Sequence, residues 1–150
     1  MNSKLMPRIR HLFLAACLIV CASPLQAEIV VVVSSKSPLH APERNQIENI
    51  FLGRIHRFPE GDEAIPIDLG VESPEREEFY LKLSDKTQAQ MKAYWSKIVF
   101  TGRGRPPPIV SDSKELIEEL DSSINNIGYM DSSKLDDRVK VLFTFTMVGQ

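Results

Sequence analysis

The fold is decided by the stretch 29–39, which reads Ile-Val-Val-Val-Val-Ser-Ser-Lys-Ser-Pro-Leu. Its first five residues, Ile29 to Val33, are all β-branched. This is the composition of a strand buried on both faces, as in parallel sheets that are covered by helices. The polar residues 34–38 end that strand in a loop, and a helix with apolar residues at helical spacing follows and ends at Gly53. The stretch therefore predicts a buried strand, a loop and a covering helix.

Strands and helices continue to alternate along the chain. The elements expected are a strand Ala64–Leu69, a helix from Ser73-Pro74 to about Leu83, a helix from Thr87, a strand Ile109–Val110, a helix from Asp112, a strand Ile127–Met130 and a strand Val139–Thr146. Tyr94, Trp95 and Phe100 lie at helical spacing and are expected in the core. This order predicts an α/β protein of one lobe, with helices against a mixed sheet.

The first 27 residues are typical of a secretory signal peptide rather than of the fold. Three basic residues precede an apolar run, Leu12 to Ala22, and a small-residue ending follows at 23–27. A membrane-spanning helix needs roughly 20 apolar residues, and this run has eleven. We therefore expect cleavage after Ala27, an exported chain 28–150 in the periplasm, and no stable membrane anchor.

The alternative interpretation of residues 1–27 is the signal of a lipoprotein, in which a cysteine is modified with lipid. Leu14-Ala15-Ala16-Cys17 is similar to the box that precedes such a cysteine in bacterial lipoproteins. Modification at Cys17 would leave about four apolar residues before the box, against the roughly 7 to 15 that a signal core needs. A soluble exported protein is therefore the favoured interpretation.

Composition and charge narrow the class of protein. The chain has 150 residues, 43% of them hydrophobic, with 18 Lys and Arg against 20 Asp and Glu. These values are typical of one globular domain and exclude a strongly basic nucleic-acid binder. Removing residues 1–27 takes away three basic residues and both cysteines, so 15 basic and 20 acidic residues remain and the net charge is −5. The exported chain thus has no disulfide and no cysteine metal site.

Motifs for catalysis are not found. The chain shows no nucleophile elbow, no phosphate-binding loop with a lysine and no dinucleotide fingerprint. His40 and His56 each stand alone in polar segments, so we interpret both as exposed loop residues rather than metal ligands. The sequence favours a protein that is not an enzyme and uses no metal or cofactor.

Loop-to-helix junctions are the candidate sites, because their backbone amides can hold a small anion. The helix start at Ser73 would offer its hydroxyl and the amides of Glu75 and Arg76. Ser35 and Lys36 leave the end of the buried strand, which is a usual site location in open α/β sheets. Arg103 and Arg105 are flanked by glycines and would reach toward the same edge of the sheet. Simpler interpretations are a helix cap for Ser73 and solvated loops for the others.

Five segments carry a resemblance to a known family: Ile50-Phe51-Leu52-Gly53-Arg54, Ser73 to Tyr80 (SPEREEFY), Tyr94-Trp95-Ser96, Phe100 to Pro106 (FTGRGRP) and Ile127-Gly128-Tyr129-Met130-Asp131. In this order they resemble the phosphate-type substrate-binding proteins of ABC transporters. The chain is similar to the small, single-lobe members of that type 2 periplasmic-binding-protein-like group. The resemblance covers nearly all of residues 28–150.

The resemblance implies an anion site, although this chain departs from the family pattern there. Two-lobed members hold phosphate in a cleft, and their Ser-Gly-Thr helix start maps onto Ser73-Pro74-Glu75. Pro74 lacks an amide donor and Glu75 adds a negative charge, so a modest affinity is expected. The implied function is periplasmic recognition of phosphate or a related small oxyanion, with an ABC permease or a second protein lobe as partner. The alternative is an interaction module that kept the lobe but lost the ligand.

Overall fold

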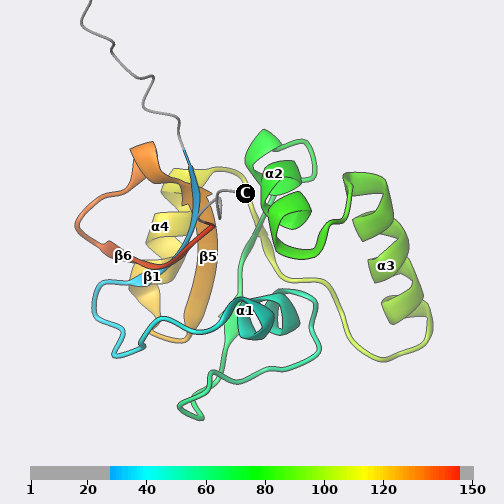
Figure 1. Cartoon of the computed structure of the whole chain (residues 1–150), viewed down its shortest axis with the longest axis horizontal. Coiled ribbons are helices and arrows are strands. Elements are labelled where there is room, and N and C mark those ends of the chain that lie inside the picture. The colour runs from blue at the N-terminus through cyan, green and yellow to red at the C-terminus, as the bar shows by residue number, and fades with distance from the viewer. Residues whose placement is uncertain (1–27, 146–150) are drawn as a thin grey trace, which may run out of the picture.

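The structure is a computed structural model that describes residues 28–145. The predicted signal peptide, residues 1–27, lies outside the described residues. A four-stranded sheet has the order β2-β5-β1-β6, with β2 at Ile65–Pro66, β5 at Asn126–Asp131, β1 at Ile29–Ser34 and β6 at Val139–Thr144. A second sheet pairs β3 (Asp68–Leu69) with β4 (Ile109–Val110). Both sheets lie in one α/β lobe, as the sequence predicts (Figure 1).

The first strand is buried along its whole length, but its pairing differs from the expectation. Every residue of β1 is buried. Its neighbours β5 and β6 both run antiparallel to it, whereas β2 runs parallel to β5. The analogy with parallel sheets was therefore wrong at β1, and the sheet is mixed. Burial on both faces reflects the covering helices and not the strand direction.

Helices cover the two faces of the four-stranded sheet. These are α1 (Arg44–Phe51), α2 (Pro74–Ser84) and α4 (Ser113–Ser122). On one side Gly128 of β5 meets α4 so closely that an added Cβ would lie 2.7 Å from Leu116 Cδ1. On the other side Tyr129 stacks on Phe79 of α2, with ring centroids 3.7 Å apart. Consecutive residues of one strand thus contact different helix layers, which fixes the register of β5.

The helix α3 (Gln88–Phe100) lies at the far edge of the molecule from β6 (Figure 1). Met91 and Trp95 are its buried residues. Phe100, which the helical spacing placed in the core, is instead 92% exposed, and Val99 is exposed as well. Phe100 lies five positions after Trp95, about 140° around the helix, and so it points away from the face that Met91 and Trp95 bury. A short 3-10 helix η1 (Ser132–Lys134) completes the list of helices in the described part.

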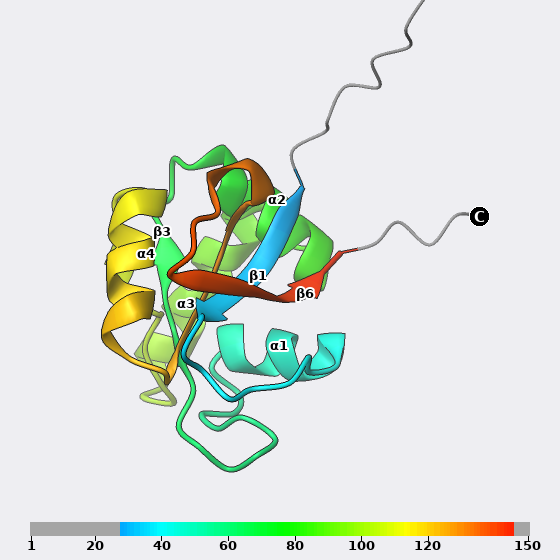
Figure 2. The same ribbon diagram turned by 90° about the vertical axis from the view of Figure 1, so that its left-hand side faces the viewer.

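Two strand predictions need correction. The expected strand 64–69 is split at Ile67, because β2 pairs with β5 while β3 turns away to pair with β4. In β6 the sequence alternates Val139, Val141, Phe143 and Phe145 with Lys140, Leu142 and Thr144, which predicts that the first set faces the core. Instead Leu142 is buried and Val141 is exposed. The pairing of β6 with β1 shifts register between Val31 and Val32, and a bulge of this kind reverses the faces that follow it. Figure 2 shows β6 crossing in front of β1.

Candidate functional site

The start of α2 forms as the sequence predicts. Ser73 has extended backbone angles, and its Oγ accepts a hydrogen bond from the backbone N–H of Arg76 at 3.4 Å. Pro74 opens the helix, where a missing amide proton costs nothing. Because the Ser73 hydroxyl proton is not used in this bond, it stays available for donation to a ligand oxygen. Ser73 is therefore a helix cap that retains one donor.

The side chain of Arg76 is buried beneath this helix start. Its Nε lies 3.1 Å from Asp68 Oδ2, and both side chains are at least 93% buried, at 7% and 2% exposure. Its Nη1 donates to Gln88 Oε1, and Gln88 in turn donates from Nε2 to the Val71 carbonyl at 2.8 Å. The Arg76 guanidinium also lies over the Tyr80 ring, 5.0 Å from its centroid. Nη2 has no hydrogen bond to any residue between 28 and 145.

Asp68 organises the floor of this region. Oδ2 accepts from Arg76 and from the Tyr80 hydroxyl at 3.0 Å. Oδ1 accepts from the Tyr129 hydroxyl and from the Leu69 N–H at 2.9 Å. These bonds come from β3, α2 and β5, so one carboxylate ties three elements together. A buried carboxylate is tolerated only when it is paired and hydrogen-bonded in this way.

The two tyrosines of this network are held in their neutral form. Burial raises the pKa of Tyr80 and of Tyr129 well above the usual value, and the negative charge of Asp68 raises each pKa further. Both hydroxyls therefore act as donors to Asp68 across the physiological range. The two tyrosine hydroxyls that bond to Asp68 thus both keep their protons.

A groove of about 950 Å³ opens beside this network. Its lining comes from Asp68 of β3 and the turn after that strand, from α2 and α3, and from residues 106 and 109. Asp68 and Arg76 lie in the lining together with Gln88, and Trp95 contributes an aromatic wall. The remaining lining residues are Val71, Glu72, Glu77, Ala89, Lys92, Ser96, Val99, Phe100, Pro106 and Ile109. A concave, largely apolar site with a few convergent polar groups is the usual form of a ligand site.

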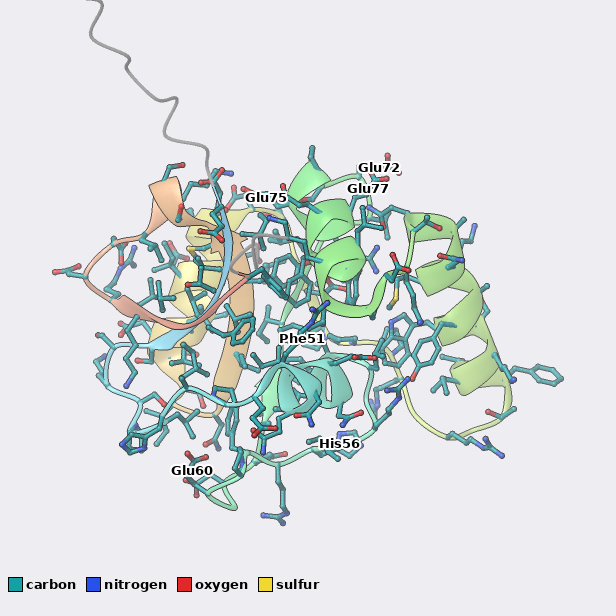
Figure 3. The ribbon with its side chains drawn as sticks, viewed as in Figure 1. Phe51, His56, Glu60, Glu72, Glu75 and Glu77 are labelled. Atoms are coloured by element: carbon teal, nitrogen blue, oxygen red, sulfur yellow. The ribbon has the colours of Figure 1, made fainter. Side chains whose placement is uncertain are left out.

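Charges in the groove are of both signs. Asp68, Glu72 and Glu77 are acidic, whereas Arg76 and Lys92 are basic, so the lining carries a formal net charge of −1. Figure 3 shows Glu72 and Glu77 on the side of α2 that faces α3, with Glu75 on the opposite side. The groove is therefore not a strongly positive site, and an anion would be held by directed hydrogen bonds rather than by net charge.

The loop after β1 lies far from this groove. Ser35 donates from its backbone N–H to the Arg138 carbonyl at 2.8 Å, and Lys36 Nζ lies 2.6 Å from Asp121 Oδ1 at the end of α4. The opposite end of β1 is the one near α2, because Glu28 bonds to Ser132 and Lys134 of the same turn pairs with Glu75. The six residues of β1 separate the two regions by about 20 Å.

The five predicted ligand residues therefore do not form one site. Only Arg76 lines the groove, and Ser73 follows the lining residue Glu72 in the chain. Ser35 and Lys36 are exposed at the other end of the sheet. The prediction that they join Ser73 relied on the strand-end rule for parallel sheets, and β1 is antiparallel to both neighbours. Arg103 is exposed in the loop between the lining residues Phe100 and Pro106.

Asp68, Gln88 and Trp95 are site residues that sequence reasoning missed. An acidic residue inside the apolar strand segment 64–69 was the signal for Asp68, since carboxylates are rarely buried unless paired. Trp95 is buried, and its Nε1 has no hydrogen-bond partner among residues 28–145. The role of Gln88 carries no sequence signal, because it depends on how α3 approaches α2.

The histidines of the described chain stand apart from one another. His40 and His56 are both exposed in irregular segments, as expected. Over residues 28–145 no group of three or more His, Cys, Asp or Glu side chains is placed to hold a metal ion. Within the same range, no helix has both the length and the apolar character that crossing a membrane requires.

Comparison with solved structures supports the fold. An ABC-type phosphate transport receptor from Vibrio cholerae matches 77% of this chain and 45% of its own, with 14% identity and a TM-score of 0.62. A Clostridium perfringens protein described as a phosphate ABC transporter substrate-binding protein, solved with bound phosphate, matches 77% and 44%, with 19% identity and a TM-score of 0.62. PstS from Borrelia burgdorferi matches 71% and 41%, with 14% identity and a TM-score of 0.53.

At the level of fold, these likenesses confirm the resemblance drawn from the sequence. The chain has the α/β architecture of a periplasmic-binding-protein lobe and spans less than half the length of the phosphate-type receptors that it resembles. The sequence matches no protein-family model and no curated protein.

Proposed function

We propose that this chain is a solute-binding lobe that holds phosphate or a related small oxyanion in the groove between α2 and α3. The observation that carries the proposal is Arg76: its guanidinium is buried, fixed by Asp68 and Gln88, and lines the groove with Nη2 unused by residues 28–145. A rigid guanidinium is a strong donor to oxyanions. The fold likeness to proteins described as phosphate receptors points to the same ligand class.

Ser73 is the second proposed donor, through its free hydroxyl proton. Arg103 lies in the exposed loop between the lining residues Phe100 and Pro106 and is not itself a lining residue. Ser35 and Lys36 are not part of this proposal, because they lie at the other end of the sheet from Arg76. In function the lobe would serve an ABC transport system after export. The export prediction rests on residues 1–27.

The expected affinity is modest. Two charge-assisted hydrogen bonds would contribute roughly 3 to 6 kcal/mol, and Glu72 and Glu77 would each oppose a dianion by about 1 kcal/mol. The balance of about 1 to 4 kcal/mol corresponds to a dissociation constant of about 1 mM at the tightest. An open groove also leaves every ligand contact in competition with water.

Isothermal titration of the purified protein with inorganic phosphate and with sulfate tests the proposal. We expect saturable heat for phosphate. Arg76→Lys keeps the positive charge but loses the planar guanidinium and its paired N–H donors. It should weaken phosphate binding by about tenfold. Because a buried substitution can disturb folding, a second variant is needed. Ser96→Glu places an acid on the exposed groove face of α3 and should weaken binding while the melting temperature stays unchanged.

Ser122→Glu is the matched control. Ser122, like Ser96, is an exposed helical serine whose hydroxyl donates to a backbone carbonyl of its own helix, but it lies on α4 away from the groove. Binding should be unaffected by this change. No heat at tens of millimolar phosphate would contradict the proposal, as would equal losses for Ser96→Glu and Ser122→Glu.

A second candidate function is protein interaction. It is favoured by the 92% exposure of Phe100 beside an apolar groove.

A further inference from the structure

The rim of the groove exposes apolar side chains. Single exposed apolar residues are ordinary on proteins, but a contiguous patch marks an interaction surface. Half of the large exposed hydrophobic residues in the described chain line this one groove, and Phe100 is almost fully exposed at the end of α3. These residues are Val71, Val99, Phe100 and Ile109. We define them together as the groove patch.

We propose that a second copy of this chain docks on the groove patch, with Phe100 of each copy entering the groove of the other. The patch contains both a projecting aromatic side chain and an apolar-walled hollow of about 950 Å³. A two-fold dimer needs one surface that is complementary to itself. The groove patch meets that requirement because it carries both Phe100 and the groove. In a two-fold dimer, Phe100 of each copy would therefore enter the groove of the other.

Charge complementarity supports the same partner. Arg103 and Arg105 are exposed just after Phe100, and neither takes part in an ion pair within residues 28–145. Glu72 and Glu77 line the α2 wall of the groove and are likewise without ion pairs in that range. A Phe100 that enters the groove of its partner would carry this basic loop to the acidic wall of the other copy.

The dimer does not require phosphate and is tested without it, although the partner's Phe100 and a bound phosphate would use the same groove.

Sedimentation velocity of the purified protein in phosphate-free buffer, across a range of concentrations, tests the proposal. We expect a concentration-dependent dimer. Phe100→Asp should weaken dimerisation by about tenfold or more, as expected for a buried aromatic anchor. Val141→Asp is the matched control, because Val141 is an exposed hydrophobic residue on β6 and does not line the groove. At concentrations low enough for the unaltered protein to be monomeric, both variants should melt at its temperature.

Exchanging the charges of the basic loop and the acidic wall tests whether these two surfaces meet in the dimer. Arg103→Glu with Arg105→Glu should weaken the dimer, and adding Glu72→Arg with Glu77→Arg in the same chain should restore it. A protein that stays monomeric at every concentration would overturn the proposal. A dimer that survives Phe100→Asp, or that Val141→Asp weakens equally, would overturn it too. Loss of the dimer with phosphate binding retained would leave the proposed function in place.

Discussion

Replacing Asp68 with asparagine tests whether one buried carboxylate organises the groove floor. Asp68 is 2% exposed and accepts four hydrogen bonds. The donors are Arg76, Tyr80, Tyr129 and the Leu69 backbone. Asparagine has nearly the same shape, but it keeps a single acceptor oxygen and turns an NH₂ group toward hydrogen-bond donors. The substitution thus leaves the guanidinium buried without its counter-charge.

The magnitude follows from that orphaned charge. Breaking a buried ion pair on one side typically costs about 3 to 5 kcal/mol. Each tyrosine hydroxyl that loses its acceptor would add about 1 to 3 kcal/mol if the effects were independent, and effects within one network are not additive. We expect about 4 kcal/mol for Asp68→Asn. Since domains are stable by about 5 to 15 kcal/mol, most of the stability would be lost.

Urea unfolding, followed by the fluorescence of Trp95, the sole tryptophan, is the assay. Asp121→Asn is the control, because Asp121 pairs with Lys36 at 2.6 Å but on the surface, with exposures of 33% and 64%. Exposed pairs contribute about 0 to 1 kcal/mol. Adding Arg76→Met to Asp68→Asn removes the orphaned charge and should recover part of the loss.

Two results would refute this reasoning. The first is a loss below about 1 kcal/mol for Asp68→Asn, comparable with the surface control. The second is a double variant no more stable than Asp68→Asn alone. In either case the buried carboxylate would not be what holds Arg76 in place, and the groove floor would need another explanation.

Three further predictions concern packing, capping and pH. Gly128→Ala should destabilise the protein by about 1 to 3 kcal/mol in urea unfolding, because the new Cβ would meet Leu116 at 2.7 Å in a filled core. Ser73→Ala should cost about 1 kcal/mol as a lost cap, measured by the same method. Burial, and then the neighbouring negative charge, raise the pKa of Tyr80 and Tyr129, so unfolded tyrosines release protons near pH 10 while folded ones keep them. Stability should therefore be insensitive to these two groups below about pH 9 and should fall above about pH 10, by up to about 2.7 kcal/mol per pH unit.

Each of these has a control or a contrary outcome. Gly70→Ala should be nearly neutral, because no atom lies within 4 Å of the added Cβ. Unchanged stability in Gly128→Ala would mean that α4 can shift away from β5. Ser73→Ala that unfolds like the unaltered protein but no longer binds phosphate would favour a ligand role for Ser73 over a capping role. An unfolding free energy that stays level from pH 9 to 11 would contradict the pKa argument.

Local features were predictable from the sequence because their causes are local. The caps at Ser73 and Thr87 form as predicted, and the Thr87 hydroxyl accepts from the Gln90 N–H at 3.3 Å while the Gln90 side chain accepts from Thr87. Gly53 adopts the positive φ of 65° that ends a helix. Each of these depends on residues within four positions of one another, so the printed sequence contains the whole interaction.

Features that depend on partners distant in sequence were not predictable. The composition of β1 shows that it is buried but says nothing of whether its neighbours run parallel or antiparallel. For that reason the sequence grouped Ser35 with Ser73, whereas the structure places them at opposite ends of β1. Phe100 follows Trp95 by five positions, about 140° around the helix, so it does not lie on the face that Met91 and Trp95 bury. The Asp68 network joins residues up to 61 positions apart, which no local pattern reveals.

Whether a ligand occupies the groove at Arg76 is tested most directly by nuclear magnetic resonance. The protein, labelled with ¹⁵N, would be titrated with inorganic phosphate while the Arg76 Nε–H and the Trp95 indole N–H are observed. We predict saturable shifts of these two signals, with the backbone amides of Ser35 and Lys36 unmoved. Shifts centred on Ser35 and Lys36, or no saturable shift at all, would contradict the placement of the solute site.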